Sequence, residues 1–202
     1  MTRIAAAASS PLYRARLDSP LGALEAMAED AGVLLLEFDE PRRLDLQRRR
    51  LRRYRNGAVR DAMHPLLERL REELTAYWAG RLHRFSVPLS LTGTDFQCEV
   101  WSALQQIPYG QTRAYEQLAA MLGRTNASRA IGAANGANRL ALLIPCHRLI
   151  GKQGQLTGYG GGLWRKQRLL ALEAGDPEAA REAAPAAVRP NAGRRPPAAP
   201  RR

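Results

Sequence analysis

Cysteine, histidine and lysine are scarce in this sequence, and the scarcity of the first two excludes whole classes of site. The two cysteines, Cys98 and Cys146, cannot build a disulfide framework and form no Cys-x-x-Cys pair. The three histidines are scattered, so a structural zinc site with four ligands at regular spacing is not expected. We therefore expect reduced thiols and predict neither a metal nor any other cofactor.

Long apolar runs are also missing. No run approaches the about 20 residues that cross a membrane, and the apolar stretch after Met1 is shorter than the roughly 7–15 residues of a secretory signal. We therefore expect a cytoplasmic protein without a membrane partner. With 202 residues, 45% of them hydrophobic, the chain can form one large or two small domains.

Acidic residues are few relative to basic ones, 19 against 31, which gives a formal net charge of +12. This balance favours a polyanionic partner. However, Lys152 and Lys166 are the only lysines, and the richness in arginine and alanine is equally typical of GC-rich coding. The arginine-dense residues 41–60 indicate a solvated face or a connector, and we assign them no function.

Residues 1–92 are predicted to form a small α/β scaffold domain. Apolar stretches at 12–17, 21–28 and 33–38, separated by turn residues, predict an antiparallel meander. Helical spacing of apolar residues predicts an amphipathic helix over 64–78, and a short strand is expected at 85–91. Gly93 then leads into the second half of the chain.

Residues 93–175 are predicted to form a mostly helical domain. Thr94 is a plausible N-cap of a helix that ends before Pro108, and further helices are expected at 115–122 and from about 127 to 135–137. The last two, joined by a tight turn, are a helix-turn-helix candidate. A buried run at 140–144, a glycine-rich loop at 151–162 and a closing helix at 163–174 follow. Residues 176–202, rich in Ala, Pro and Arg, are predicted to be disordered.

The chemistry centres on Cys146, which follows the buried run and Pro145 and precedes His147. A lone cysteine is commonly just a small buried hydrophobe, but a neighbouring imidazole is the usual means of making a thiolate. In extended chain the two side chains would point to opposite sides, so the base must reach the thiol around a bend or through a water. A carboxylate should orient the histidine, and spacing alone does not choose among Glu173, Glu116 and Asp95.

The segment Ile144-Pro145-Cys146-His147-Arg148 resembles the O6-alkylguanine-DNA alkyltransferases. Further matching segments are GAANGAN at 132–138, TGYGGGL at 157–163 and IPYG at 107–110. The similarity covers about residues 94–175, while the first half agrees only in length and pattern. The family's fold is α+β, and the resemblance implies a ribonuclease H-like first domain and a winged helix-turn-helix-like second domain.

The resemblance also implies a role for each matching residue. Cys146 would accept the alkyl group irreversibly, once per molecule. His147 would deprotonate it through a water, and Glu173 would orient His147. Asn138 would form a hinge, and Tyr115 would contact the guanine. Arg129 would fill the place of the extruded base. The implied substrate pocket consists of Pro145, Tyr159, Gly160 and Trp101, and the implied DNA contacts are Ser128, Arg129, Ala130, Asn135 and Tyr115.

Elementary chemistry agrees with these roles. The O6 substituent of a guanine cannot be reached inside a duplex, so the base must be flipped out. The predicted helix after 127 carries almost no long side chains except Arg129, which suits the minor groove of double-stranded DNA better than major-groove readout. The alternative is that its alanines and glycines only allow close packing on the protein's own core.

The sequence departs from the family's pattern at two positions. Arg139 stands where many relatives have proline, and Gly160 stands where some have serine, alanine or arginine, which bears on tolerance of bulky alkyl groups.

A non-catalytic lesion-binding helix-turn-helix protein is the main alternative function, although relatives of that kind replace the cysteine that is present here. A thiol hydrolase would need a distant base and an oxyanion site, and we identify neither. We expect a monomer without an obligate protein partner.

Overall fold

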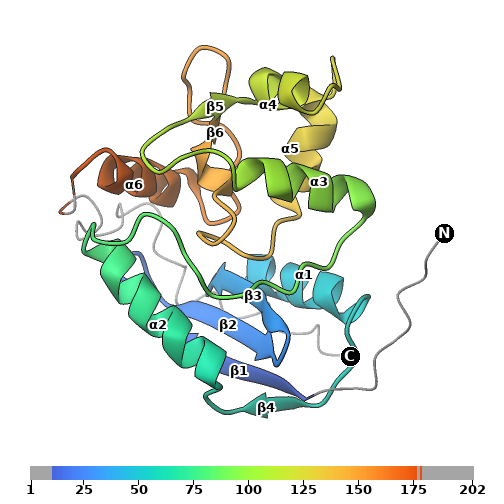
Figure 1. Cartoon of the computed structure of the whole chain (residues 1–202), viewed down its shortest axis with the longest axis vertical. Coiled ribbons are helices and arrows are strands. Elements are labelled where there is room, and N and C mark those ends of the chain that lie inside the picture. Colours follow the sequence, from blue (N-terminus) through green and yellow to red (C-terminus); the bar gives the residue numbers. More distant parts are fainter. Residues whose placement is uncertain (1–10, 177, 179–202) are drawn as a thin grey trace, which may run out of the picture.

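The computed structural model describes residues 11–176 and 178 and has a mixed α+β fold (Figure 1). Strands β1 (Leu12–Leu17), β2 (Leu24–Glu29) and β3 (Gly32–Phe38) form the expected antiparallel meander. A short strand that was not predicted, β4 (Val59–Asp61), pairs in parallel with β1 and gives the order β3-β2-β1-β4. The predicted tail at 176–202 lies almost entirely outside the described residues.

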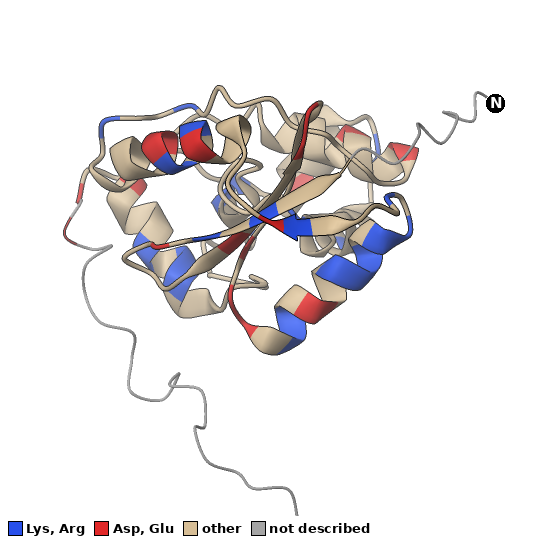
Figure 2. Cartoon of the chain, turned by 90° about the horizontal axis from the view of Figure 1, so that it is seen from below, with Lys and Arg blue, Asp and Glu red and all other residues tan. Residues whose placement is uncertain are grey.

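Two helices cover the two faces of this sheet. Helix α2 (Pro65–Trp78) packs Leu67, Leu70 and Leu74 against one face, as its spacing predicts. The arginine-dense segment is not a connector, because residues Pro41–Arg52 form helix α1 on the opposite face (Figure 2). The buried residues Leu44 and Leu51 of α1 join a second apolar cluster with the sheet. With both faces covered, all seven residues of β3 are buried.

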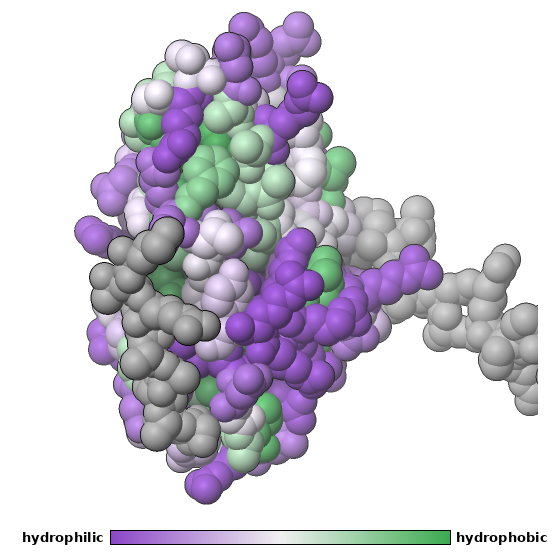
Figure 3. Space-filling model, turned by 90° about the vertical axis from the view of Figure 1, so that its right-hand side faces the viewer, coloured by the Kyte–Doolittle hydropathy of each residue, from purple (hydrophilic) through white to green (hydrophobic). Residues whose placement is uncertain are grey.

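The solvent side of α1 is strongly basic. Figure 3 shows hydrophilic side chains gathered over α1 on this side of the molecule. The exposed residues there include Arg42, Arg49, Arg52 and Arg53. The predicted solvated arginine face is therefore one side of an amphipathic helix.

The strand expected at 85–91 does not form. This segment touches β3 only around Leu89, where Val33 N donates to Pro88 O at 2.9 Å and Ser90 N donates to Val33 O at 2.9 Å. Pro88 has no N–H to extend the ladder, which explains why the contact stays a single bridge.

The helices of the second half follow the predicted pattern. They are α3 (Asp95–Leu104), α4 (Tyr115–Met121), α5 (Ser128–Gly136) and α6 (Leu163–Glu173). Two short strands, β5 (Arg113–Ala114) and β6 (Leu149–Ile150), pair in parallel, and Cys146–Arg148 form one turn of 3-10 helix, η1. Among the described residues, no helix is long and apolar enough to cross a membrane.

The two halves meet through the segment that follows α5. Leu36 N of β3 donates to Arg139 O, and Ala141 N donates to Leu36 O, both at 2.8 Å. One apolar cluster includes residues from both halves, among them Leu36, Leu70 and Leu104. The sheet therefore holds the start of the segment that leads to Cys146, whereas the domain boundary at 92/93 remains a prediction.

The N-terminus of α3 provides a test of local stability. Thr94 forms a capping box in which its Oγ1 accepts from Gln97 N at 3.3 Å and its N donates to Gln97 Oε1 at 3.1 Å. We expect Thr94→Ala to lower the free energy of unfolding by about 1 kcal/mol in urea titrations, whereas Thr94→Ser should retain most of it. Equal losses in both variants would contradict a role for the hydroxyl.

Candidate functional site

Cys146 is placed by a short buried segment with a strained backbone. Leu142 adopts a positive φ of 69°, and residues 140–144 are buried without forming a strand or helix. Asn138 supports this turn from inside, because its Oδ1 accepts from Leu140 N at 2.9 Å and its Nδ2 donates to Ile144 O at 3.0 Å. The predicted hinge residue thus holds the segment leading from α5 to Cys146.

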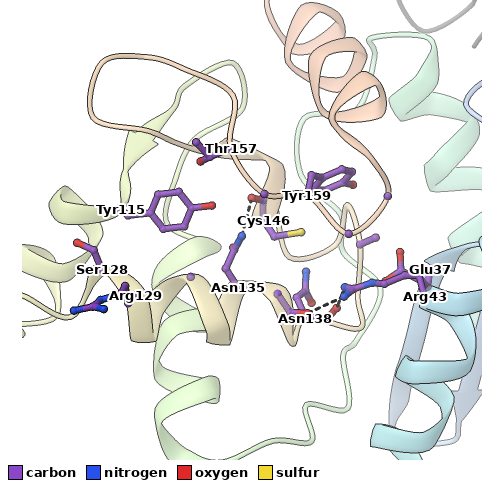
Figure 4. Close-up of a pocket in the computed structure, with 16 residues that line it drawn as sticks. Glu37, Arg43, Tyr115, Ser128, Arg129, Asn135, Asn138, Cys146, Thr157 and Tyr159 are labelled. Atoms are coloured by element: carbon purple, nitrogen blue, oxygen red, sulfur yellow. Dashed lines mark hydrogen bonds and ion pairs between the residues drawn. The ribbon is translucent and has the colours of Figure 1, made fainter. Parts of the chain in front are cut away.

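A cavity of about 540 Å³ opens above Cys146, between α5, the loop at 157–161 and the first turn of α1 (Figure 4). Cys146 is only 6% exposed, and Figure 4 shows Tyr115 and Asn135 pointing toward it. Burial raises the pKa of Cys146 to about 11, despite the opposing effect of Asn138. The thiol is therefore protonated at neutral pH.

His147 lies behind the cavity and not in it. The η1 turn carries its ring into the core, where it is fully buried and Nε2 lies 2.8 Å from Glu173 Oε1. With Nε2–H donated to a carboxylate, Nδ1 carries the lone pair. Nδ1 is buried and has no hydrogen-bond partner among the described residues. Of the three candidate carboxylates, Glu173 is the one that meets the histidine.

Glu173, at the end of α6, accepts hydrogen bonds from donors in several parts of the chain. Besides His147, Tyr77 OH donates to Oε1 at 2.8 Å, and Arg148 donates through Nε at 2.8 Å and Nη2 at 2.9 Å. Gly110 N donates to Oε2 at 3.3 Å. Burial alone would raise the pKa of Glu173, but His147 and Arg148 outweigh it and hold that pKa far below its usual range. The carboxylate is thus ionised inside the core.

Gly110 must be glycine for this contact. Its φ is +73°, and an added Cβ would lie 2.8 Å from the backbone oxygen of Glu173. The IPYG motif at 107–110, which follows α3, therefore brings its backbone directly against the end of α6.

Most of the predicted site residues share the cavity. Tyr115, Ser128, Arg129, Tyr159 and Gly160 line it together with Cys146. Burial raises the pKa of Tyr115 and Tyr159, so both phenols stay protonated. Ala130 is exposed on the outer face of α5.

Three predictions need correction. Trp101 does not line the cavity, because its indole is buried under α5 and Nε1 donates to Ala134 O at 3.0 Å. Pro145 lines a separate hollow with His83 and Arg148. Asn135 was assigned to the DNA-facing surface, but helix periodicity turns it inward, where Nδ2 donates to Cys146 O at 3.4 Å.

Four polar side chains around the cavity were not predicted. Glu37 of β3, Arg43 of α1 and Thr157 line it. Lys166 lies behind it, where the buried Nζ donates to Leu149 O and to Thr157 O, the latter at 2.7 Å, and fixes the loop to β6. Burial lowers the pKa of Lys166 to about 8. No sequence pattern distinguishes Arg43 from its many arginine neighbours.

Comparison with known proteins agrees with this geometry. The family described as 6-O-methylguanine DNA methyltransferase, DNA binding domain, matches residues 95–188. A methylated-DNA–protein-cysteine methyltransferase of Methanosarcina acetivorans is 39% identical over 165 residues, which cover 80% of this chain and 98% of that protein. The chain belongs to the methylated-DNA–protein-cysteine methyltransferase family. The resemblance found in the sequence is thereby confirmed.

Other members of the family are more similar over a shorter stretch. The methyltransferase of Mycolicibacterium paratuberculosis is 58% identical over 102 residues, which cover 50% of this chain and 62% of that protein. The match thus spans less than two thirds of the relative's length. The crystal structure of Mycobacterium tuberculosis OGT in complex with DNA has a TM-score of 0.70 and 37% identity and covers 84% of this chain and 99% of that one.

The Glu173 network gives a prediction for stability against pH. Its pKa is lower in the folded chain than the value of about 4.3 expected when unfolded, so its stabilisation is complete above that pH and is lost as the pH falls below it. We expect Glu173→Gln to cost about 3–5 kcal/mol at pH 7, because Arg148 would lose its buried counter-charge. The difference from the wild type should shrink steadily below about pH 4.

Urea unfolding between pH 3 and pH 7 measures both quantities. Glu116→Gln is the control, because its half-exposed pair with Lys152 should change stability by less than about 0.5 kcal/mol. A pH-independent loss in Glu173→Gln would show that the ionised carboxylate is not the stabilising species.

Proposed function

We propose that this protein repairs DNA by moving an alkyl group from O6 of guanine to Sγ of Cys146. The observation that carries the proposal is the buried thiol at the floor of a cavity, backed by the His147–Glu173 pair. In the transfer, the S–C bond forms as the C–O6 bond breaks, and the thiol proton ends on the departing guanine. The product is a thioether, so each molecule acts once.

The relay begins at Glu173. Its ionised carboxylate fixes the tautomer of His147 and favours the imidazolium that forms when the ring accepts a proton. The unpartnered Nδ1 is the basic atom, and it acts on the Cys146 thiol through one water. Because burial opposes the thiolate, deprotonation is coupled to the arrival of substrate, and the resting thiol is protected from other electrophiles.

The cavity suits a purine. Asn135 Oδ1, Thr157 Oγ1 and Tyr159 OH are buried on its walls and have no hydrogen-bond partner among the described residues. Buried polar atoms without partners are costly, so they favour a ligand with matching donors and acceptors. The edge of a flipped guanine offers both, and we assign Tyr115 to the proton transfer that helps the guanine leave.

Double-stranded DNA is the proposed partner, bound through the minor groove. The exposed face of α5 consists of Arg129, Ala130, Ala133 and Gly136, so only one long side chain projects from it. Such a face can approach the groove closely, with Ser128 beside the rim of the cavity. Arg129 lies at the mouth of the cavity, where it can fill the gap left by the extruded base.

The same proposal covers the finer architecture. We infer that α4 and α5 form a winged helix-turn-helix-like unit within a domain at 93–175, and that the sheet of residues 1–92 is ribonuclease H-like. The turn between the helices contains Gly123 and Asn126, both with positive φ. We further propose that the protein works in the cytoplasm, as a monomer on DNA.

The stoichiometry of transfer tests the proposed activity. Incubation with a duplex containing O6-methylguanine should add one methyl group per chain, on the peptide that contains Cys146, as measured by mass spectrometry. Cys98→Ala is the matched control and should react like the wild type, whereas Cys146→Ala should not react. Multiple turnovers, or tight lesion binding without methylation, would contradict the proposal, and the latter would favour the non-catalytic alternative.

Base extrusion by Arg129 makes a separate prediction. Arg129→Ala should slow transfer from the duplex by about tenfold or more, because unstacking a base costs a few kcal/mol. Transfer from free O6-benzylguanine should change little, since no base has to be extruded. Comparable losses on the two substrates would contradict the assignment.

A further inference from the structure

Arg43 separates the cavity above Cys146 from a second one. The second cavity, of about 440 Å³, is lined by Glu40, Pro41, Arg42, Gly162, Trp164 and Arg165, and it shares Arg43, Gly160 and Gly161 with the first. In Figure 4, Arg43 lies at the end of the first cavity opposite Arg129, and Sγ of Cys146 points toward that end. An alkyl group approaching the sulfur from the guanine side would therefore extend toward Arg43.

The guanidinium of Arg43 is held in one position by three acceptors. Nε donates to Glu37 Oε2 at 2.8 Å, Nη1 to Gly136 O at 2.8 Å and Nη2 to Asn138 O at 2.9 Å. Glu37 is only 2% exposed. A planar group bound on all its edges to a buried carboxylate and two carbonyls forms a rigid wall.

The wall rests directly on Gly160. A Cβ added there would lie 2.5 Å from Cζ and 2.6 Å from Nε of Arg43, closer than any van der Waals contact allows. The two cavities thus meet where the guanidinium covers the glycine backbone. Loss of the guanidinium would join them.

The second cavity has an apolar, partly aromatic lining. Trp164 and Pro41 contribute its apolar surface. The guanidinium of Arg165 lies 4.4 Å from the ring centre of Trp164 and 4.5 Å from that of Phe38, and its Nη1 donates to Glu40 Oε1 at 2.7 Å. Because its charge is neutralised within the protein, the site suits a flat uncharged group.

We propose that Arg43 limits the size of the alkyl group and that the second cavity, which Arg43 separates from the first, is a subsite for the distal part of bulky, aromatic O6 substituents. With Arg43 in place, the protein favours small groups such as methyl. When Arg43 is removed, a benzyl group can extend into the second cavity. This inference rests on the proposed alkyl transfer and specifies its substrate class.

The test compares two lesions in the same duplex, O6-methylguanine and O6-benzylguanine. The rate of Cys146 alkylation is measured for each by intact mass. The benzyl-to-methyl rate ratio should rise by about tenfold or more in Arg43→Ala, in the range that pocket size alone supplies. Because Arg43 also holds Gly136 and Asn138, both rates can fall together, and the ratio cancels that common loss.

Two further variants sharpen the comparison. Arg49→Ala, on the exposed side of the same helix, should leave the ratio unchanged. Arg43→Lys keeps the charge opposite Glu37 but lacks the planar group over Gly160, so it should raise the ratio even if the alanine variant does not fold. Gly160→Ala should change the ratio more in the wild type than in the Arg43→Ala background, because the added methyl group meets the guanidinium only in the wild type.

An unchanged or lower ratio in folded Arg43→Ala or Arg43→Lys would overturn the inference, as would a Gly160→Ala effect that is equally large without Arg43. Methyl transfer that proceeds normally while the ratio fails to move would leave the proposed function intact. Absence of transfer from both lesions in the wild type would overturn the function and this inference together.

Discussion

Glu173 is the charge around which the site is built. A carboxylate at the C-terminal end of a helix is disfavoured by the helix dipole, and burial disfavours it further. It persists because Arg148 and His147 surround it, and because Tyr77 and the backbone of Gly110 complete its hydrogen bonds. These partners come from three different parts of the chain. One ionised group at the end of α6 thereby aligns α2, the loop that follows α3 and η1 behind the thiol.

The sheet contributes to the site as directly as the helical half does. Leu36 binds the backbone on both sides of residue 140, and Arg43 binds the carbonyls of Gly136, the last residue of α5, and of Asn138. The segment between α5 and Cys146 is consequently held from the sheet side and, through Asn138, from within. This constraint keeps the thiol at a fixed position relative to α5, the helix that we propose to contact DNA.

Local patterns predicted the elements whose apolar spacing is clear, and tertiary contacts decided the rest. Helix α1 was missed because arginines fill half of its positions and its buried stripe contains only two apolar residues, Leu44 and Leu51. A strand was predicted at 85–91, but the chain meets the sheet edge only near Leu89. At the site, the motif identified Cys146 and its relay through family resemblance. Contacts such as Tyr77 with Glu173 join residues 96 positions apart and leave no local signal.

The most direct test of the account is the ionisation of Cys146 in the absence of substrate. The rate of alkylation by iodoacetamide, measured against pH in the Cys98→Ala background, should rise with a midpoint near the value of about 11 that burial imposes. Transfer from O6-methylguanine in duplex DNA should already be efficient at neutral pH, because the His147–Glu173 relay removes the proton when substrate is bound. An iodoacetamide midpoint near pH 7 would reveal a preformed thiolate and would contradict the account.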